Sequence, residues 1–151
     1  MQLSKQNIKN IIPQPGLIIP GEELFNLPEK VLQFGTGVLL RGLPDYFIDK
    51  ANRNGIFNGR VVVVKSTASG GTDAFDQQDG LFTLCIRGIE NDKQVEELVI
   101  NSSISRVLSA NEEWKAVLQC AHHSEMKIII SNTTEVGIIL SKSVLILADF
   151  S

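Results

Sequence analysis

The apolar residues of this chain fall into short continuous runs separated by stripes with a helical period. The runs are VLQF at residues 31–34, VVVV at 61–64 and III at 128–130. Uninterrupted apolar runs of this length, rich in β-branched residues and bounded by turn residues, are typical of strands buried on both faces of a parallel sheet. We therefore expect three buried strands at these positions.

Two stripes of apolar residues at three- and four-residue spacing lie between the expected strands, at residues 39–51 and 114–121. This spacing predicts one amphipathic helix in each region, with the apolar stripe facing the sheet. Pro44 lies near the start of the first helix, where its missing N–H costs little. Ser109 and Glu112 match a capping box at the start of the second helix.

Residues 81–87 and 94–100 predict a β-hairpin joined by a turn at 88–92. Residues 66–80 form a polar loop rich in Ser, Thr, Gly and Asp, and residues 1–29, with four of the five prolines, predict an irregular lead-in. The expected order of strand, helix, strand, hairpin, helix and strand is that of a βαβ unit. The prediction is an α/β fold, a Rossmann-type dinucleotide-binding unit with an inserted β-hairpin.

Composition narrows the class of protein. The 151 residues are 43% hydrophobic and 21% charged, with a net charge of −3, as in a globular protein without a basic surface for nucleic acid. No apolar run is long enough to span a membrane, and residues 1–16 contain no apolar core of a secretory signal. Cys85 and Cys120 stand alone, which favours a reducing cytoplasm. We expect no nucleic-acid or membrane partner, and the oligomeric state is open.

Other isolated side chains predict structural roles. Cys85 is expected to be a small buried hydrophobe and Trp114 a core residue. His122 and His123 are adjacent near the end of the second helix, where they point in different directions and do not form a joint metal site. The sequence shows no metal-ligating cluster and no pair of nucleophile and base.

Gly35-Thr36-Gly37 lies between a predicted strand and a predicted helix. In this context the first glycine permits a tight turn, the second lets the backbone approach a pyrophosphate, and the helix N-terminus attracts the phosphates. Leu40 replaces the third glycine of the usual GxGxxG pattern, and no GK[ST] follows, which disfavours a P-loop. A glycine-rich βα turn without a ligand is the alternative.

The second strand ends at Lys65-Ser66 and lacks the carboxylate that usually accepts a hydrogen bond from the adenosine ribose. Asp73 and Asp76 lie in the loop beyond it. Either this loop folds back to supply the contact, or Lys65 leaves room for a 2′-phosphate. The sequence leaves the choice between NAD and NADP open.

Four segments in order resemble the mannitol dehydrogenase family of polyol-specific long-chain dehydrogenases. Residues 30–41 match its GxGxxxR fingerprint, and residues 78–83, 86–88 and 131–135 match the branch that acts on keto sugar acids. The resemblance covers residues 30 to 139 approximately. It implies a Rossmann-type fold, NAD as cofactor, a small-molecule sugar acid as substrate and reversible hydride transfer to its keto group.

The resemblance and the glycine turn together assign the cofactor site. Backbone N–H groups of the turn are expected near the pyrophosphate, Lys65 and Ser66 near the adenosine, and Asn132 and Thr133, with Glu135, near the nicotinamide ribose or the substrate. The predicted cofactor-binding residues are Phe34, Gly35, Thr36, Gly37, Val38, Leu39, Arg41, Lys65, Ser66, Asn132 and Thr133. Alternatively, Arg41 is an exposed helix arginine and residues 132–135 are turn formers. Gly70-Gly71 would allow the loop at 67–80 to close over the cofactor.

The family's catalytic lysine, with its asparagine and histidine partners, lies in a second, mostly helical domain that this sequence does not match. We therefore assign no catalytic residue and expect a partial NAD-binding domain at 30–137, a tail at 138–151 unlike the family, and no turnover by this chain alone. A frameshift or a premature stop is one hypothesis for the origin of this tail, and the sequence leaves it open. The alternatives are a non-catalytic nucleotide-binding module and a degenerate fragment.

Overall fold

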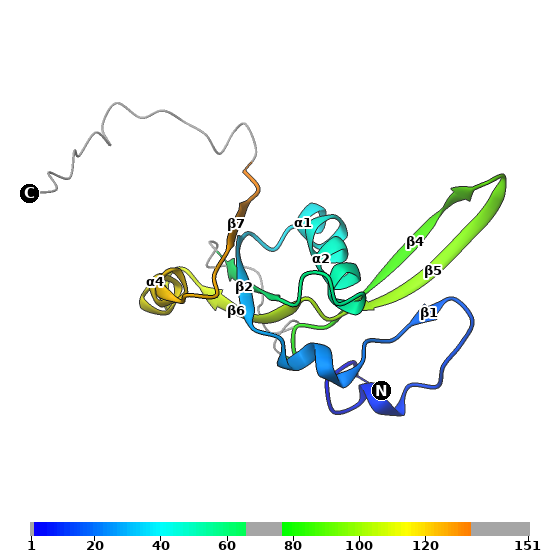
Figure 1. Cartoon of the computed structure of the whole chain (residues 1–151), viewed down its shortest axis with the longest axis horizontal. Helices are drawn as coiled ribbons and strands as arrows, with labels where there is room; N and C mark the ends of the chain where they lie inside the picture. The colour runs from blue at the N-terminus through cyan, green and yellow to red at the C-terminus, as the bar shows by residue number, and fades with distance from the viewer. Residues whose placement is uncertain (1, 66–76, 134–151) are drawn as a thin grey trace, which may run out of the picture.

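A four-stranded parallel sheet forms the centre of the fold (Figure 1). The computed structural model describes residues 2–65 and 77–133. The sheet has the order β6-β3-β2-β7, formed by Ile104–Ser109, Arg60–Lys65, Glu29–Phe34 and Ile128–Ser131. In chain order this is 3-2-1-4, the beginning of the doubly wound dinucleotide-binding arrangement. The predicted α/β, Rossmann-type class is confirmed.

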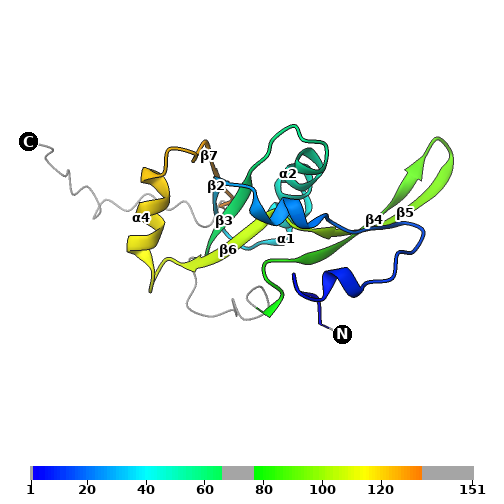
Figure 2. The same ribbon diagram turned by 60° about the horizontal axis from the view of Figure 1, so that its bottom comes forward.

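Helices lie on both sides of this sheet, with α4 and α2 on opposite faces (Figure 2). The helices are α1 (Val38–Gly42), α2 (Pro44–Arg53) and α4 (Trp114–His122). Even-numbered residues of β2 and β3, such as Leu32 and Val62, pack with Val117 and Cys120 of α4. Odd-numbered residues, such as Val63, pack on the other face with Ile48 of α2 and Phe82. The four valines at 61–64 are therefore buried on both faces, as predicted.

A second sheet contains the predicted hairpin, which projects away from the parallel sheet (Figure 1). It has the order β1-β5-β4, formed by Leu17–Ile18, Lys93–Asn101 and Phe82–Glu90. The predicted five-residue turn is wrong, because Gly88 pairs with Val95 and the strands continue to Glu90 and Lys93. The turn itself is Asn91-Asp92, with φ of 51° and 59°. Asn and Asp tolerate this left-handed conformation, which a two-residue type I′ turn requires.

The N-terminal segment packs on the base of the hairpin. It contains two short 3-10 helices, η1 (Ile8–Asn10) and η2 (Glu22–Asn26), besides strand β1. Ile8 forms a third apolar cluster with Leu81 and Ile100. The segment expected as an irregular lead-in thus contributes buried side chains to the fold.

The single helix predicted after the glycine turn is two helices, α1 and α2, separated at Leu43, whose φ and ψ are −117° and −80°. Pro44 begins α2, and only part of the predicted apolar stripe faces inward, because Leu40 is buried and Ile48 packs on the sheet. Leu39 and Phe47 are 59% and 56% exposed, whereas the buried residues of α2 are Asp45, Asp49 and Asn52.

The buried face of α2 is polar because the hairpin base presents polar groups to it. The backbone N–H and hydroxyl of Ser102 both donate to Asp49 Oδ1, at 2.8 and 2.9 Å. Asn52 exchanges two hydrogen bonds with the backbone of Gly59. A helical period alone could not reveal these partners, which lie up to 53 residues away.

The start of the last helix also differs from the prediction. Ser109 ends β6, a strand that the apolar pattern did not predict. The N–H of Ser109 donates to Glu113 Oε2 at 2.9 Å, so Glu113 rather than Glu112 reaches back. Trp114 is 50% exposed and Cys85 is exposed, contrary to expectation. Val117 and Cys120 face the sheet instead, which turns Trp114 outward.

Gly80 lies in close contact with the backbone of Ile104 in β6, where the hairpin meets the parallel sheet. We expect Gly80→Ala to lower the free energy of unfolding by about 2 kcal/mol or more, because φ is +77° and a Cβ would lie 2.6 Å from the carbonyl oxygen of Ile104. Chemical denaturation measures the loss. Gly55→Ala is the matched control, since φ is +67° there but the space is open. Equal losses in the two variants would contradict the close contact at Gly80.

Candidate functional site

Three strand ends meet at the carboxyl edge of the parallel sheet. Phe34, the last residue of β2, is in register with Val64 of β3 and Ser131 of β7. The residues that follow are Gly35, Lys65 and Asn132, so segments from three parts of the sequence lie at one edge. The strand order reverses between β2 and β7, because β3 and β6, which follow β2 in the chain, lie on one side of β2 and β7 lies on the other. This is the switch point at which open α/β sheets bind ligands.

The glycine turn is held to the sheet at its first residue. Gly35 N–H donates to Val64 O at 2.9 Å, and the φ of Gly35 is +116°. A Cβ at this position would lie 3.1 Å from Leu40 Cδ1, the side chain that replaces the third glycine of the usual pattern. Gly37 is exposed, and a Cβ there would meet no atom within 4 Å. The turn thus requires glycine at residue 35 and leaves open space at residue 37.

Residues after the turn lie on the short helix α1. Val38 and Leu39 are exposed, and Arg41 is partly buried in the last turn of this five-residue helix. Gly37 is the N-cap residue, and its carbonyl accepts from Arg41 N–H at 3.2 Å. The helix behind the turn is therefore much shorter than predicted.

The remaining predicted residues border the same edge. Lys65 ends β3, is partly buried, and accepts from the N–H of Ala110 at 2.8 Å through its carbonyl oxygen. Asn132 and Thr133 follow β7 and are exposed. Ser66, the loop with Gly70-Gly71, and Glu135 lie outside the described residues.

Two polar side chains beneath the turn were not predicted as part of the site. Gln33 and Asp45 are both fully buried, and Gln33 Nε2 lies 3.3 Å from Asp45 Oδ2 and 3.5 Å from the carbonyl oxygen of Gly35. Burial raises the pKa of Asp45 to about 7, against the opposing effects of the Gln33 hydrogen bond and the charge of Arg41. The available signals were a glutamine inside an apolar run and an aspartate directly after Pro44.

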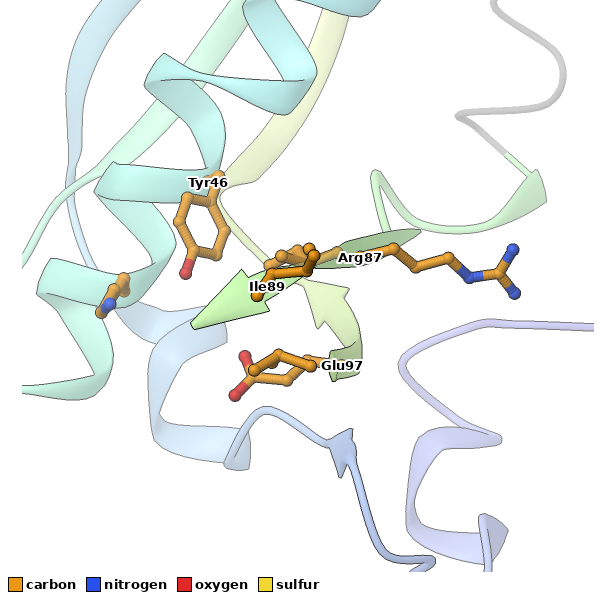
Figure 3. A pocket seen from close by; sticks show the side chains of 8 residues that line it. Tyr46, Arg87, Ile89 and Glu97 are labelled. Atoms are coloured by element: carbon orange, nitrogen blue, oxygen red, sulfur yellow. The ribbon is translucent and has the colours of Figure 1, made fainter. Parts of the chain in front are cut away.

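A groove of about 410 Å³ lies elsewhere, between α2 and the hairpin (Figure 3). Tyr46 borders it from α2, Ile89 and Arg87 from β4 and Glu97 from β5, and the guanidinium of Arg87 points away from Tyr46. The residues predicted to bind a cofactor do not line this groove. Its position therefore adds nothing to the site at the strand ends.

Other kinds of site find no support within residues 2–65 and 77–133. That part of the chain holds no group of three or more His, Cys, Asp and Glu residues placed to bind a metal ion. Its helices are too short or too polar to cross a membrane. His122 and His123 are exposed at the end of α4.

Comparison with solved structures defines the class of fold. The chain is similar to a mannitol 2-dehydrogenase from Pseudomonas fluorescens, solved as a ternary complex with NAD and D-mannitol, with a TM-score of 0.75 and 24% identity over 87% of this chain and 26% of that one. A D-sorbitol dehydrogenase in substrate-free form gives a TM-score of 0.72 and 18% identity over 93% of this chain and 29% of that one. The fold is that of the Rossmann-type portion of these polyol dehydrogenases. No family model matches the chain.

Sequence comparison identifies the particular relatives, which are altronate oxidoreductases. The chain is 41% identical to the protein from Halalkalibacterium halodurans over 113 residues and 42% identical to that from Bacillus subtilis over 112 residues, in each case 74% of this chain. These segments are 22% and 23% of the relatives' lengths, so the chain spans less than a quarter of the curated relatives it matches. The resemblance predicted from the four motifs is confirmed.

Proposed function

We propose that this chain binds NAD(H) at the carboxyl edge of its parallel sheet, as the cofactor-binding part of an oxidoreductase of the altronate oxidoreductase type. The observation that carries the proposal is the meeting of the glycine turn with the ends of β3 and β7 at the switch point. The relatives are named altronate oxidoreductases, and the similar mannitol 2-dehydrogenase was solved with NAD.

The residues present fit a dinucleotide. The open space at Gly37 lets a pyrophosphate approach the backbone of the turn, and the positive φ of Gly35 directs the chain away from the strand end. In this proposal the backbone N–H groups of Thr36 and Gly37 hold the pyrophosphate, and Gly35, whose own N–H is bonded to Val64, shapes the turn. Phe34, Val38, Leu39 and Arg41 lie around the pyrophosphate. Lys65 and Ser66 hold the adenosine end, and Asn132 and Thr133 border the nicotinamide ribose or the substrate.

The proposed reaction is D-altronate + NAD⁺ ⇌ D-tagaturonate + NADH + H⁺, with tagaturonate reduction as its reverse. NAD⁺ held at this edge would supply the acceptor for the hydride from the carbinol carbon, and a general base would take the hydroxyl proton. The part of this chain is to hold and orient the cofactor beside the substrate. No described residue at the strand ends is assigned as the general acid or base. We therefore propose that catalysis needs further residues of a longer protein and that this chain alone does not turn over substrate.

The first test is a titration of the purified chain with NADH and with NADPH, followed by the fluorescence of the reduced cofactor. We expect saturable binding of NADH, stronger than that of NADPH. Absence of binding by a sample that unfolds cooperatively would overturn the proposed function. Preference for an unrelated nucleotide would favour a non-catalytic binding module instead.

An assay with tagaturonate tests the second part of the proposal. We expect no oxidation of NADH by this chain alone, and steady turnover would show that the chain holds its own general acid.

For the location, we propose the cytoplasm, because Cys85 and Cys120 are free cysteines, which persist in a reducing compartment.

A further inference from the structure

Gln33 and Asp45 form a contact between the strand that leads into the glycine turn and the first turn of α2. Both side chains are fully buried. Gln33 Nε2 donates to Asp45 Oδ2 at 3.3 Å, and the same nitrogen lies 3.5 Å from the carbonyl oxygen of Gly35. A single amide group therefore links β2, the turn and α2.

The other two oxygen atoms of this pair of side chains lack hydrogen-bond donors. Gln33 Oε1 and Asp45 Oδ1 are both inaccessible to solvent, and neither has a hydrogen-bond donor within the described residues. Buried acceptors without a donor are rare and destabilising. An ionised Asp45 is an acceptor at both oxygens and has no proton to offer Gln33. The deficit therefore falls on the two partners of one contact.

A single proton removes both deficits. A protonated carboxyl group donates one hydrogen bond and accepts another, and a primary amide does the same. We propose that Asp45 is protonated in the folded protein and donates from Oδ1 to Gln33 Oε1, forming a closed acid–amide pair that positions the carbonyl of Gly35 in the glycine turn. The claim about the turn's effect on cofactor binding rests on the proposed function, whereas the shared proton does not.

The surroundings of Asp45 favour the neutral form on balance. Arg41 of α1 is the cation that acts on it and favours ionisation, but burial has the larger effect. Asp49, one turn further along α2, has its own partners, Arg53 at 2.9 Å and the N–H and hydroxyl of Ser102. Asn101 of β5 is uncharged and donates to the backbone carbonyl of Asp45, at 3.0 Å, rather than to its carboxyl group.

The direction of the pH dependence follows from this balance. The pKa of Asp45 is about 7 in the folded chain and 3.8 for an unperturbed aspartate. The folded state therefore binds more protons than the unfolded state between these values, so stability falls as pH rises through this window and levels off above it. Loss of the proton also removes the donor to Gln33 Oε1, which frees the amide to leave Gly35.

Carbon-13 NMR of the chain labelled at aspartate carboxyl carbons tests the shared proton directly. We expect one resonance to titrate near pH 7 and to be missing from the spectrum of Asp45→Asn. Titration of every aspartate near its ordinary value would overturn the acid–amide pair. This measurement needs no cofactor, so it decides the pair even if NADH does not bind.

Asp45→Asn also serves as a neutral mimic, because its amide can donate to Gln33 Oε1 and accept from Gln33 Nε2. We expect its urea midpoint to change less between about pH 5 and about pH 8 than that of the unmodified chain. Asp92→Asn, at the exposed hairpin turn, is the matched control and should keep the full pH dependence. Equal pH dependence of both variants would overturn the proposal.

NADH affinity measured across the same pH range tests the link to the turn. We expect affinity to weaken as pH rises through 7 in the unmodified chain and in Asp92→Asn, and to weaken less in Asp45→Asn. A pH-independent affinity, with the NMR titration as expected, would overturn the positioning role alone. Failure of NADH to bind at any pH would instead count against the proposed function.

Discussion

Replacing Arg60 by methionine should lower the free energy of unfolding by about 3 kcal/mol, the largest stability effect we expect from one side chain. Arg60 is buried at the start of β3, and its guanidinium donates to the carbonyl oxygens of Phe25, Ser102 and Ile104. Methionine keeps the apolar stem but leaves three carbonyl groups without this donor. The loss is large because one side chain joins η2, the hairpin base and β6.

Chemical denaturation of Arg60→Met measures this effect, and Arg106→Met is its control. Arg106 pairs with Glu29 at 2.9 Å near the surface, and its side chain is 48% exposed. Exposed ion pairs contribute about 1 kcal/mol or less. Similar losses in the two variants would show that the buried carbonyl groups find other donors and that Arg60 does not clamp the N-terminal segment.

Replacing Gly37 by leucine should weaken NADH binding at least about tenfold, or about 1.4 kcal/mol. The side chain would occupy the open space in front of the turn, where the proposed function places the pyrophosphate. Stability should change little, because a Cβ at Gly37 meets no atom within 4 Å and its φ is −65°. Fluorescence titration and denaturation of the same sample separate the two effects.

Gly42→Leu is the matched control for this experiment. Gly42 is exposed at the end of α1, and a Cβ there also meets no atom within 4 Å. It should leave NADH binding nearly unchanged, since it lies one turn of helix away from the strand ends. Equal weakening by both variants would locate the cofactor elsewhere or indicate a general disturbance of α1.

Much of the parallel sheet could be predicted because its strands carry their signal locally. The four valines of β3 are apolar at every position, and only a strand covered on both faces buries all of them. Strand β6 was missed because ISRVLS exposes Arg106 and pairs with a neighbour, β3, on one side among the described strands. An edge strand needs fewer apolar residues, so its pattern is weaker.

At the candidate site, too, some residues could be predicted from the local sequence and others only from the pairing of strands. Gly35-Thr36-Gly37 was recognisable because a tight strand-to-helix turn needs glycine, and the φ of +116° at Gly35 bears out that need. That Lys65 and Asn132 lie beside it depends on strands separated by many residues pairing in register. Their roles in binding stay predictions.

Local chemistry in the sequence thus established the valine-rich strands, the hairpin and the glycine turn, because burial, alternation and backbone freedom act within a few residues. Tertiary structure decided which face of α2 is buried. Asp45 and Asp49 point inward because their partners, Gln33 and Ser102, reach them from other elements, while Leu39 and Phe47 remain outside. A polar group becomes a stable core residue only when a partner from elsewhere in the chain meets it, and such a meeting leaves no periodic trace in the sequence.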